Sequence, residues 1–427
     1  ALAAGRPMGL PNRRYDCFWI AAVQCLRHTQ GFAGALEAAL PRAGEAAADL
    51  PGALAELLCS MHQAEGTGRL PAAALAGFRA QAYRALPAAD RSRKLVQEDP
   101  DEQKQQDTHE FLTALLDAVG SAPLPGETGS SPRHKAPVDK DVSQRLEALE
   151  KEISEVVRRR ETHSENHSAS ARIKANLQNL IYEYSMIQWA MSSTRMHSPS
   201  LSALFEGQRL AHTKCQRCGR FCASGAEPFV VEEVTVNSNR FENWWLSQLG
   251  QLGSWMQSTP TSVPLKDLIS EESPAPEGYR CPKCMQVGCS TRTAQYLRLP
   301  ATYILHVNRA QPDGGRCEIA LEFEATLHLG RLGLVAHFGK PLDRNLSPCP
   351  TRYSLQAAVF HRGATARSGH YFAYVLFKGS WVQLDDDKVV CPRRSSEATP
   401  MALEASAPEG GPRVVLLFYQ RDVPPQG

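Results

Sequence analysis

Three residue types that can do covalent chemistry together occur along this chain in the order cysteine, histidine, carboxylate. Cys17 precedes an apolar helical pattern, His370 begins an alternating segment, and Asp385, with Asp386 after it, ends a short run that starts at a tryptophan. A thiol attacks as a thiolate once a base has taken its proton, and an imidazole base needs a third group to orient it. If Cys17, His370 and Asp385 meet in the fold, the protein is a cysteine hydrolase.

The segment around Cys17 favours an activated thiol. Apolar residues recur at helical spacing from Phe18 to Leu26, which places Cys17 at the start of a helix. At that end the positive pole of the helix dipole lowers the pKa of a thiol. Asn12 lies upstream, and its side-chain amide can donate a hydrogen bond to a developing oxyanion. The alternative is a cysteine that only packs within a helix.

The segment around His370 predicts a hairpin. His370 begins a strand-like pattern directly after Gly369, whose missing side chain would leave room for a substrate backbone. A turn at residues 378–380 then leads to a neighbouring strand, and a hairpin of that length can bring Asp385 beside His370. The alternative is a histidine that caps an ordinary strand.

A second cysteine pattern predicts a metal centre. Four of the 12 cysteines form two Cys-x-x-Cys pairs, namely Cys215 with Cys218 and Cys281 with Cys284. Four thiolates satisfy tetrahedral Zn(II) as a closed structural site, so we expect zinc in preference to redox thiols. The long gap between the pairs requires them to lie at the tips of separate hairpins. Cys222 and Cys289 are either spectators or alternative ligands.

Composition narrows the class of protein. With 427 residues, 42% of them hydrophobic and 22% charged, the chain is expected to be globular and to hold more than one subdomain. A net charge of +2, without a basic helix beside the cysteine pairs, predicts no nucleic-acid partner. No apolar run approaches the roughly 20 residues of a membrane span. Residues 1–8 contain no secretory segment, and the cysteine usage predicts the cytoplasm, the nucleus or both.

The predicted secondary structure changes from mainly helical to mainly strand near residue 204. An amphipathic helix is predicted over residues 107–119, after Ala-rich stretches that predict short helices. Residues rich in β-branched and aromatic side chains predict strands at 230–236, 303–307, 354–360, 371–376 and 414–419. This order predicts an α+β protein.

Between residues 121 and 199 the chain carries a charged insertion. Residues 121–140 are rich in Pro, Gly and Ser and predict a flexible linker. Two short heptad-like runs follow within 141–190 and predict a helical hairpin, or an element for self-association or a partner helix. An amphipathic helix packed on its own domain is the simpler interpretation.

Together these motifs resemble the ubiquitin-specific protease family of deubiquitinating enzymes. The Cys box of that family reads Gly-Leu-x-Asn-x-Gly-Asn-Thr-Cys-Tyr-Met-Asn-Ser-x-x-Gln-Cys-Leu. This chain keeps Gly9, Leu10, Asn12, Cys17, Gln24, Cys25 and Leu26. Further similar segments follow in the family order at 105–112, 204–207, 279–281, 299–309, 368–371 and 418–421. The resemblance therefore covers a single catalytic domain over residues 9–421.

The resemblance implies an α+β fold with a papain-like cysteine protease core. It implies a thumb at about 9–200, which includes the insertion at 121–199, and a palm with zinc-binding fingers at about 201–421. The four cysteines of the two pairs would hold a structural Zn(II). The partners implied are ubiquitin and ubiquitinated proteins.

The resemblance also implies a role for each candidate site residue. Cys17 would attack the carbonyl carbon after the terminal glycine of ubiquitin, and His370 would take the thiol proton and later protonate the departing lysine amine. Asp385 would orient the imidazole. Asn12 would hold the oxyanion, with Asp386 as a supporting polar group.

The Cys box departs from the family pattern at several positions. Arg14 stands where the family has Gly, and a side chain there is expected to reshape the oxyanion loop. Asp16, in place of Thr, adds a negative charge that opposes thiolate formation unless it is paired or turned away. Ala310 replaces the aromatic residue usual after the arginine of the 299–309 segment. These departures motivate an alternative function, a catalytically weak or inactive ubiquitin-binding scaffold of the same fold.

Overall fold

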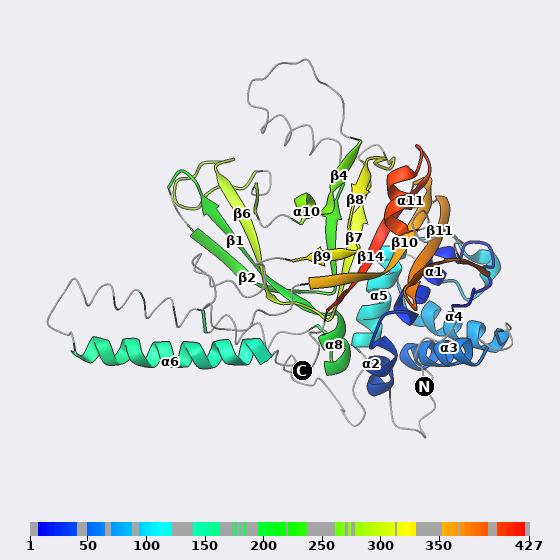
Figure 1. Cartoon of the computed structure of the whole chain (residues 1–427), viewed down its shortest axis with the longest axis horizontal. Coiled ribbons are helices and arrows are strands. Elements are labelled where there is room, and N and C mark those ends of the chain that lie inside the picture. The colour runs from blue at the N-terminus through cyan, green and yellow to red at the C-terminus, as the bar shows by residue number, and fades with distance from the viewer. Residues whose placement is uncertain are drawn as a thin grey trace, which may run out of the picture.

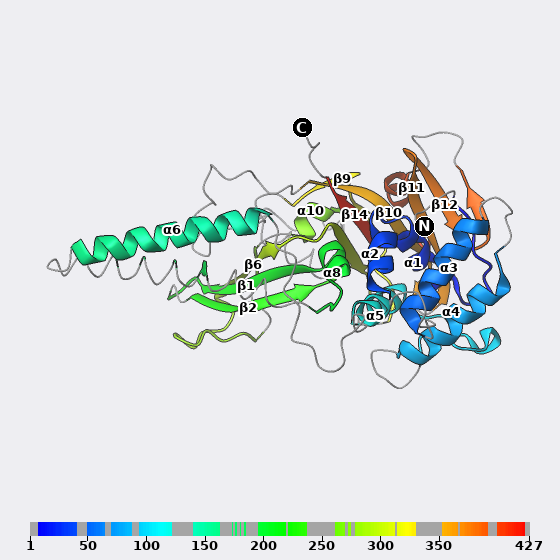
Figure 2. The ribbon, with the colours of Figure 1, turned by 90° about the horizontal axis from the view of Figure 1, so that it is seen from below.

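The structure, a computed structural model, combines a lobe of helices with a large central sheet and a second, extended sheet (Figure 1). It describes residues 7–40, 49–64, 70–87, 94–121, 140–162, 173, 176, 180, 183–184, 195–218, 221–236, 261–269, 272–274, 278–311, 314–329, 352–365, 368–391 and 399–422. The helical lobe lies at one end of the molecule and the extended sheet at the other (Figures 1 and 2).

The helical lobe surrounds α1. Its elements are α1 (Cys17–Arg27), α2 (Phe32–Ala39), α3 (Leu50–Ala64), α4 (Ala72–Ala85), η1 (Pro100–Glu102) and α5 (Thr108–Gly120). Every residue of α1 is buried, as expected for a short helix that is apolar on all sides. α1 packs against α5 on one side and against strands of the central sheet on the other. Asp107 begins α5, because its carboxylate accepts hydrogen bonds from the backbone N–H groups of His109 and Glu110 at 2.7 and 3.0 Å.

The central sheet has the strand order β13-β12-β11-β10-β14-β7-β3, with β9 paired to β10. The strands are β3 (Val231–Thr235), β7 (Thr302–Asn308), β9 (Thr326–His328), β10 (Arg352–Thr365), β11 (Ser368–Phe377), β12 (Ser380–Asp385), β13 (Lys388–Val390) and β14 (Pro412–Arg421). Neighbours are antiparallel except for β3 and β7. One hydrophobic core packs this sheet against α1 and α5. A second core packs it against short elements that contribute Val263, Leu265 and Leu321.

The second sheet, of order β2-β1-β6-β5, extends away from the helical lobe (Figure 1). Its strands are β1 (Gly207–Cys215), β2 (Phe221–Phe229), β5 (Glu272–Pro274) and β6 (Ser290–Arg298). Further described elements are a small parallel pair, β4 (Ser262–Pro264) and β8 (Ala320–Glu322), and the helices α8 (Pro199–Phe205), α10 (Leu265–Leu268) and α11 (Pro400–Ser406).

The described part of the insertion contains one long helix and a few helical residues of the second heptad-like run, while the rest of the predicted hairpin lies outside the described residues. The long helix α6 (Lys140–Thr162) projects on the side of β1 and β2 in both views (Figures 1 and 2). Its Leu149 is fully buried against a group that includes Val156 and Leu180. Tyr184 donates a hydrogen bond to Glu150 at 2.8 Å. The apolar stripe is thus covered from within the chain, and self-association stays a prediction.

The predicted amphipathic helix and the five predicted strands are all present, as α5, β3, β7, β10, β11 and β14. Of the linker predicted at 121–140, residues 122–139 are outside the described residues. No helix in the described part of the chain combines the length and the hydropathy that a membrane span requires.

Candidate active site and metal centre

The helical lobe supplies the candidate nucleophile. Cys17 is the first residue of α1, as predicted, and its side chain is 2% exposed. The backbone N–H groups of Trp19 and Ile20 both donate to the carbonyl of Asp16, at 3.1 Å, which closes the first turn of the helix behind the sulfur. The thiol therefore lies at the positive end of the α1 dipole, where an anion is stabilised.

The central sheet supplies the candidate base and its partner. Lys378 and Gly379, both with positive φ, form the two-residue turn that joins β11 to β12, and this turn suits the twist of a hairpin. The ladder pairs Ala373 with Leu384, so Asp385 lies on the sheet face that His370 shares. His370 Nε2 and Asp385 Oδ1 are 2.5 Å apart. The predicted hairpin is confirmed, and it joins these two side chains.

The charge of His370 follows from these contacts. The hydrogen bond with Asp385, followed by one with the sulfur of Cys17, raises the pKa of His370 from its ordinary value of 6.5 to about 10. The same bond with His370 lowers the pKa of Asp385. Because Nε2 of His370 bonds to Asp385, Nδ1 is the ring nitrogen that is available to Cys17. The site thus brings a thiol, an imidazolium and a carboxylate into one chain of contacts.

Asn12 and Asp386 fasten the loop before Cys17 to the end of the β11–β12 hairpin. Asn12 Nδ2 donates to Asp386 Oδ2 at 2.9 Å, and Asn12 Oδ1 accepts from the backbone N–H of Asp16 at 3.0 Å. The N–H of Leu10 donates to the carbonyl of Asp386 at 2.8 Å. A Cβ on Gly9 would lie 2.3 Å from the backbone of Asp387, so only glycine allows this approach. Burial raises the pKa of Asp386.

Asp16 is neutralised within the protein. Its side chain is 1% exposed and forms an ion pair with Arg79 of α4, which also donates to the carbonyl of Gln97 at 3.0 Å. The Arg79 guanidinium lies 5.9 Å from the centre of the Trp19 ring. The charge that was expected to oppose the thiolate is therefore paired. Nothing in the sequence identified Arg79, because an arginine in an Ala-rich helix is ordinarily a solvent-facing residue.

Arg14 has a left-handed backbone conformation. Its φ is +73°, and its side chain reaches the carbonyl of Asp101 at 2.7 Å. A residue with a Cβ thus occupies the left-handed region, which costs roughly 1–2 kcal/mol relative to the right-handed one. The expected reshaping of the loop relative to the family stays a prediction.

This strain predicts that Arg14→Gly and Arg14→Ala differ in stability, although both remove the contact with Asp101. We expect Arg14→Gly to be more stable than Arg14→Ala by about 1 kcal/mol, because only the first removes the Cβ. Urea unfolding of the two variants measures the difference. Equal midpoints would show that the loop carries no strain at this position.

Gln105 is a further residue of the site, and no role was predicted for it from the sequence. Its Oε1 accepts a hydrogen bond from the backbone N–H of Gly369 at 3.1 Å, directly before His370. Gly369 also serves the sheet. A Cβ there would lie 2.1 Å from the carbonyl oxygen of Arg362 on β10, so the close pairing of β10 and β11 requires this glycine. Gly369 lines an open pocket of about 680 Å³ together with Tyr15 and Gln105, and passage of a substrate chain beside it stays a prediction.

A cavity of about 420 Å³ lies beside the candidate site. Its lining includes Asp107 of α5, Tyr371, which follows His370, and Ala310. The departure from the family pattern at Ala310 thus lies at this cavity. Arg316 also lines it, on the side of the central sheet.

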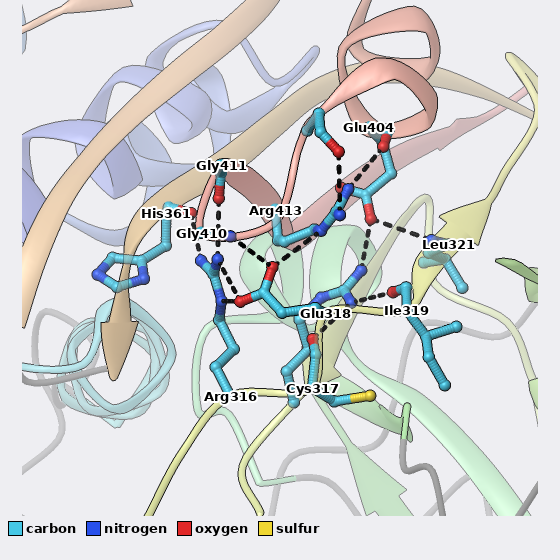
Figure 3. A network of polar contacts seen from close by, with 12 residues as sticks. Arg316, Cys317, Glu318, Ile319, Leu321, His361, Glu404, Gly410, Gly411 and Arg413 are labelled. Atoms are coloured by element: carbon cyan, nitrogen blue, oxygen red, sulfur yellow. Dashed lines mark hydrogen bonds and ion pairs between the residues drawn. The ribbon is translucent and has the colours of Figure 1, made fainter. Parts of the chain in front are cut away.

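A buried charged network holds this wall of the cavity (Figure 3). Arg316 donates to the carbonyl of His361 on β10 at 2.9 Å and pairs with Glu318 at 2.8 Å. Arg413 of β14 donates to the carbonyl of Glu404 on α11 at 2.9 Å, and the Glu404 carboxylate pairs with Arg309 at 2.6 Å. The network joins β10, β14 and α11, and so keeps the strand that precedes β11 in place.

The four predicted metal ligands meet at the far end of the second sheet. One sulfur from each of Cys215, Cys218, Cys281 and Cys284 lies within 4.8 Å of all the others. Sγ of Cys215 is 3.6 Å from Sγ of Cys284, and Sγ of Cys218 is 3.6 Å from Sγ of Cys281. A tetrahedral zinc site with Zn–S bonds of about 2.3 Å has sulfur–sulfur edges of about 3.8 Å. The donor set and its spacing therefore fit Zn(II).

Of the two other cysteines near this cluster, only Cys289 has a described side chain. Sγ of Cys289 lies 3.4 Å from Sγ of Cys215, whereas the side chain of Cys222 is outside the described residues. Among the described residues, the second group of possible metal ligands is His370, Asp385 and Asp386. The hydrogen bond between His370 and Asp385 already accounts for that arrangement.

Comparison with known proteins gives a family and a fold. The family model described as ubiquitin carboxyl-terminal hydrolase matches residues 8–419. The chain is 30% identical over 122 residues, 28% of its length, to ubiquitin carboxyl-terminal hydrolase 17-like protein C of Mus musculus. It is also 30% identical over 122 residues to ubiquitin carboxyl-terminal hydrolase 3 of Homo sapiens. The matched segments span 21% and 22% of the length of those two relatives.

The solved structures extend the likeness to nearly the whole chain. The SAGA Ubp8/Sgf11/Sus1/Sgf73 DUB module bound to ubiquitin aldehyde matches with a TM-score of 0.56 at 14% identity. That match covers 98% of this chain and 70% of the other. At this identity the likeness establishes the fold alone, which is a mixed α/β fold. The cysteine cluster in the extended sheet is seen in the structure of this chain.

Proposed function

Since the chain belongs to the ubiquitin carboxyl-terminal hydrolase family, we propose that it is a deubiquitinating cysteine protease. The bond cleaved is the isopeptide or peptide bond after the C-terminal glycine of ubiquitin in protein conjugates. The observation that carries the proposal is the joining of Cys17, His370 and Asp385, which come from two separate parts of the sequence. Ubiquitin and ubiquitinated proteins are the proposed partners.

The chemistry begins with a thiolate at Cys17 and an imidazolium at His370. The sulfur attacks the carbonyl carbon, and His370, which holds its proton up to about pH 10, donates that proton to the departing lysine amine. Water then attacks the thioester while His370 takes a proton from it, and ubiquitin is released. Asp385 keeps the ring in the orientation that both transfers need.

Asn12 is the proposed oxyanion donor. Its side-chain nitrogen carries two hydrogens, of which one serves the contact with Asp386 at 2.9 Å. The second is available for the oxygen that becomes negative when Cys17 attacks. Asp386 and the N–H of Asp16 fix the amide from both ends, which gives the preorganisation that oxyanion stabilisation depends on.

The alternative, a weak or inactive ubiquitin-binding scaffold, receives little support from the two departures beside Cys17. Arg79 pairs with Asp16, and Arg14 has the left-handed backbone conformation that glycine adopts readily. Labelling with electrophilic probes built on ubiquitin and on ubiquitin-like modifiers tests the proposal. A covalent adduct of the ubiquitin probe with the folded protein supports it. A folded protein that binds ubiquitin tightly and forms no adduct with any probe would establish the scaffold.

The pH dependence of hydrolysis is expected to report the pair formed by His370 and Asp385. The pKa of His370 in the folded protein is about 10. The charged imidazole therefore contributes its full stabilisation to the folded protein below about pH 6.5, and this contribution is lost as the pH rises through about 10. The alkaline limb of kcat/KM is therefore expected near pH 10. Asp385→Asn removes the main cause of the shift, so its alkaline limb should move toward lower pH.

Asp387→Asn is the matched control, because Asp387 is an exposed carboxylate in the turn that follows Asp385. Its pH profile should coincide with that of the parent. The profile of kcat/KM for a fluorogenic ubiquitin substrate, with an NMR titration of the imidazole, measures both. An unchanged alkaline limb in Asp385→Asn would contradict the assignment of Asp385 as the orienting group.

We also propose a structural Zn(II) held by Cys215, Cys218, Cys281 and Cys284. When bound, the ion joins the two Cys-x-x-Cys pairs of the extended sheet and contributes folding free energy. Cys284→Ser is expected to lower the zinc content and to make the fingers sensitive to proteases. Metal analysis and limited proteolysis measure the two effects, with Cys59→Ser, a half-buried cysteine of α3, as the control. Purified parent protein without zinc would refute this part of the proposal.

The cytoplasm and the nucleus are the proposed locations. None of the ten cysteines whose side chains the structure describes forms a disulfide, which suits a reducing compartment. The cysteine-dependent chemistry proposed for the site also needs reduced thiols.

A further inference from the structure

Five thiols meet at the far end of the second sheet, one more than a closed tetrahedral centre uses. Sγ of Cys289 lies 3.4 Å from Sγ of Cys215, a shorter distance than the 3.6 Å between Cys215 and Cys284. Cys289 is nevertheless outside the set of four sulfur atoms that all lie within 4.8 Å of one another. It therefore contacts the four-cysteine centre, at Cys215 and at Cys284, without being part of it.

The backbone holds Cys289 in this position. The N–H of Gln216 donates to the carbonyl of Cys289 at 2.8 Å, and the β1–β6 ladder pairs Cys215 with Ser290. The two thiols thus come from adjacent, hydrogen-bonded strand ends. A short side-chain movement suffices to bring the sulfur atoms to the roughly 2.05 Å of a disulfide bond. Cys215 is 2% exposed, whereas Cys289 is partly exposed, so a small oxidant reaches Cys289 first.

We propose that Cys289 is a peroxide-sensitive thiol that forms a disulfide with Cys215 and thereby removes a ligand from the proposed metal centre. The Cys289 sulfur first attacks one oxygen of the peroxide. The O–O bond breaks, an S–O bond forms, and the second oxygen leaves as hydroxide, so the sulfur becomes a sulfenic acid by loss of two electrons. The Cys215 thiolate then attacks that sulfur. An S–S bond forms, the S–O bond breaks, and the hydroxide leaves and becomes water.

The consequence is release of the metal. Three thiolates remain after Cys215 has been oxidised, and three do not close a tetrahedral structural site. The extended sheet then loses the folding free energy that the ion contributes. Reduction of the disulfide restores the ligand, so the centre is reversible. This inference rests on the proposed zinc site and is independent of the proposed hydrolysis.

The test uses the full chain, loaded with zinc and carrying Cys17→Ala so that the catalytic thiol does not react. Hydrogen peroxide is added, zinc release is followed with a chromogenic chelator, and disulfides are mapped by mass spectrometry after alkylation. We expect a disulfide-linked peptide pair of Cys215 and Cys289 that accumulates in step with zinc release. Cys289→Ser should bind zinc fully, lose that peptide pair, and release zinc several-fold more slowly.

Cys391→Ser is the matched control, because Cys391 is exposed and lies outside the cluster, and it should behave as the parent does. Equal zinc release by Cys289→Ser and the parent would overturn the proposal, as would a disulfide that joins Cys215 to Cys284 instead. Loss of zinc from unoxidised Cys289→Ser would also overturn it, because Cys289 would then be a primary ligand. Absence of zinc before oxidation would refute both this inference and the zinc site. None of these results bears on hydrolysis, which the ubiquitin probe tests.

Discussion

Cys17→Ala is expected to abolish hydrolysis of ubiquitin conjugates, with a fall in kcat of about a million-fold. The reason is that no other thiol can take its place. Cys17 lies at the end of α1 that faces His370, whereas Cys25, two turns further along the helix, is fully buried. Burial raises the pKa of Cys25 far above its ordinary value, which keeps that thiol protonated and unreactive.

The measurement combines turnover of a fluorogenic ubiquitin substrate with mass mapping of the adduct formed by an electrophilic ubiquitin probe. Cys25→Ala is the matched control in the same helix, and it should keep both turnover and the adduct at Cys17. Binding of ubiquitin should persist in Cys17→Ala, because the substitution removes only the sulfur. Residual labelling of Cys17→Ala at another cysteine would show that the nucleophile has been misassigned.

Arg79→Met is expected to destabilise the protein by about 3–5 kcal/mol, because it leaves the carboxylate of Asp16 buried without its partner. Asp16 is 1% exposed, so water cannot replace the guanidinium. The double variant Asp16→Thr with Arg79→Met restores a neutral pair and places the family residue at position 16. It should recover most of the lost stability, because a matched apolar substitution for a buried ion pair is often close to neutral.

Urea unfolding of the parent, the single variant and the double variant measures these differences. Arg84→Met is the control, because Arg84 lies in the last turn of the same helix and is exposed. It should change the free energy of unfolding by less than about 0.5 kcal/mol. If the single and the double variant were equally unstable, the ion pair would not be the cause. Turnover should fall in Arg79→Met, since an unpaired charge would then stand next to Cys17.

Local patterns of the sequence predicted most of the elements around the site. The helix that begins at Cys17, the helix that begins after Asp107, and the hairpin that ends at Asp385 all have signals within a few residues. These signals are apolar spacing, a capping carboxylate and a glycine turn, and each acts over one helical turn or one strand pair. The paired Cys-x-x-Cys units likewise predicted the four-cysteine cluster.

The contacts that set the chemistry of the site join residues far apart in the sequence. Asn12 meets Asp386 across 374 positions, and Gln105 meets Gly369 across 264. No periodic pattern records such a pair, because the partners are brought together only when the helical lobe packs on the central sheet. The backbone conformations of Gly369 and Arg14 depend on tertiary contacts in the same way. Their backbones are fixed by β10 and by the loop around Cys17, which a local pattern cannot place.

By itself, the sequence determined the candidate reacting groups, the elements that carry them and the four cysteines proposed as metal ligands, because side-chain chemistry and short-range periodicity are local properties. Only the tertiary structure decided the state of those groups. It placed Arg79 against Asp16, joined His370 to both Cys17 and Asp385, and set Cys289 beside Cys215. Charge and reactivity depend on burial and on neighbours within a few ångströms, and the fold alone chooses these neighbours.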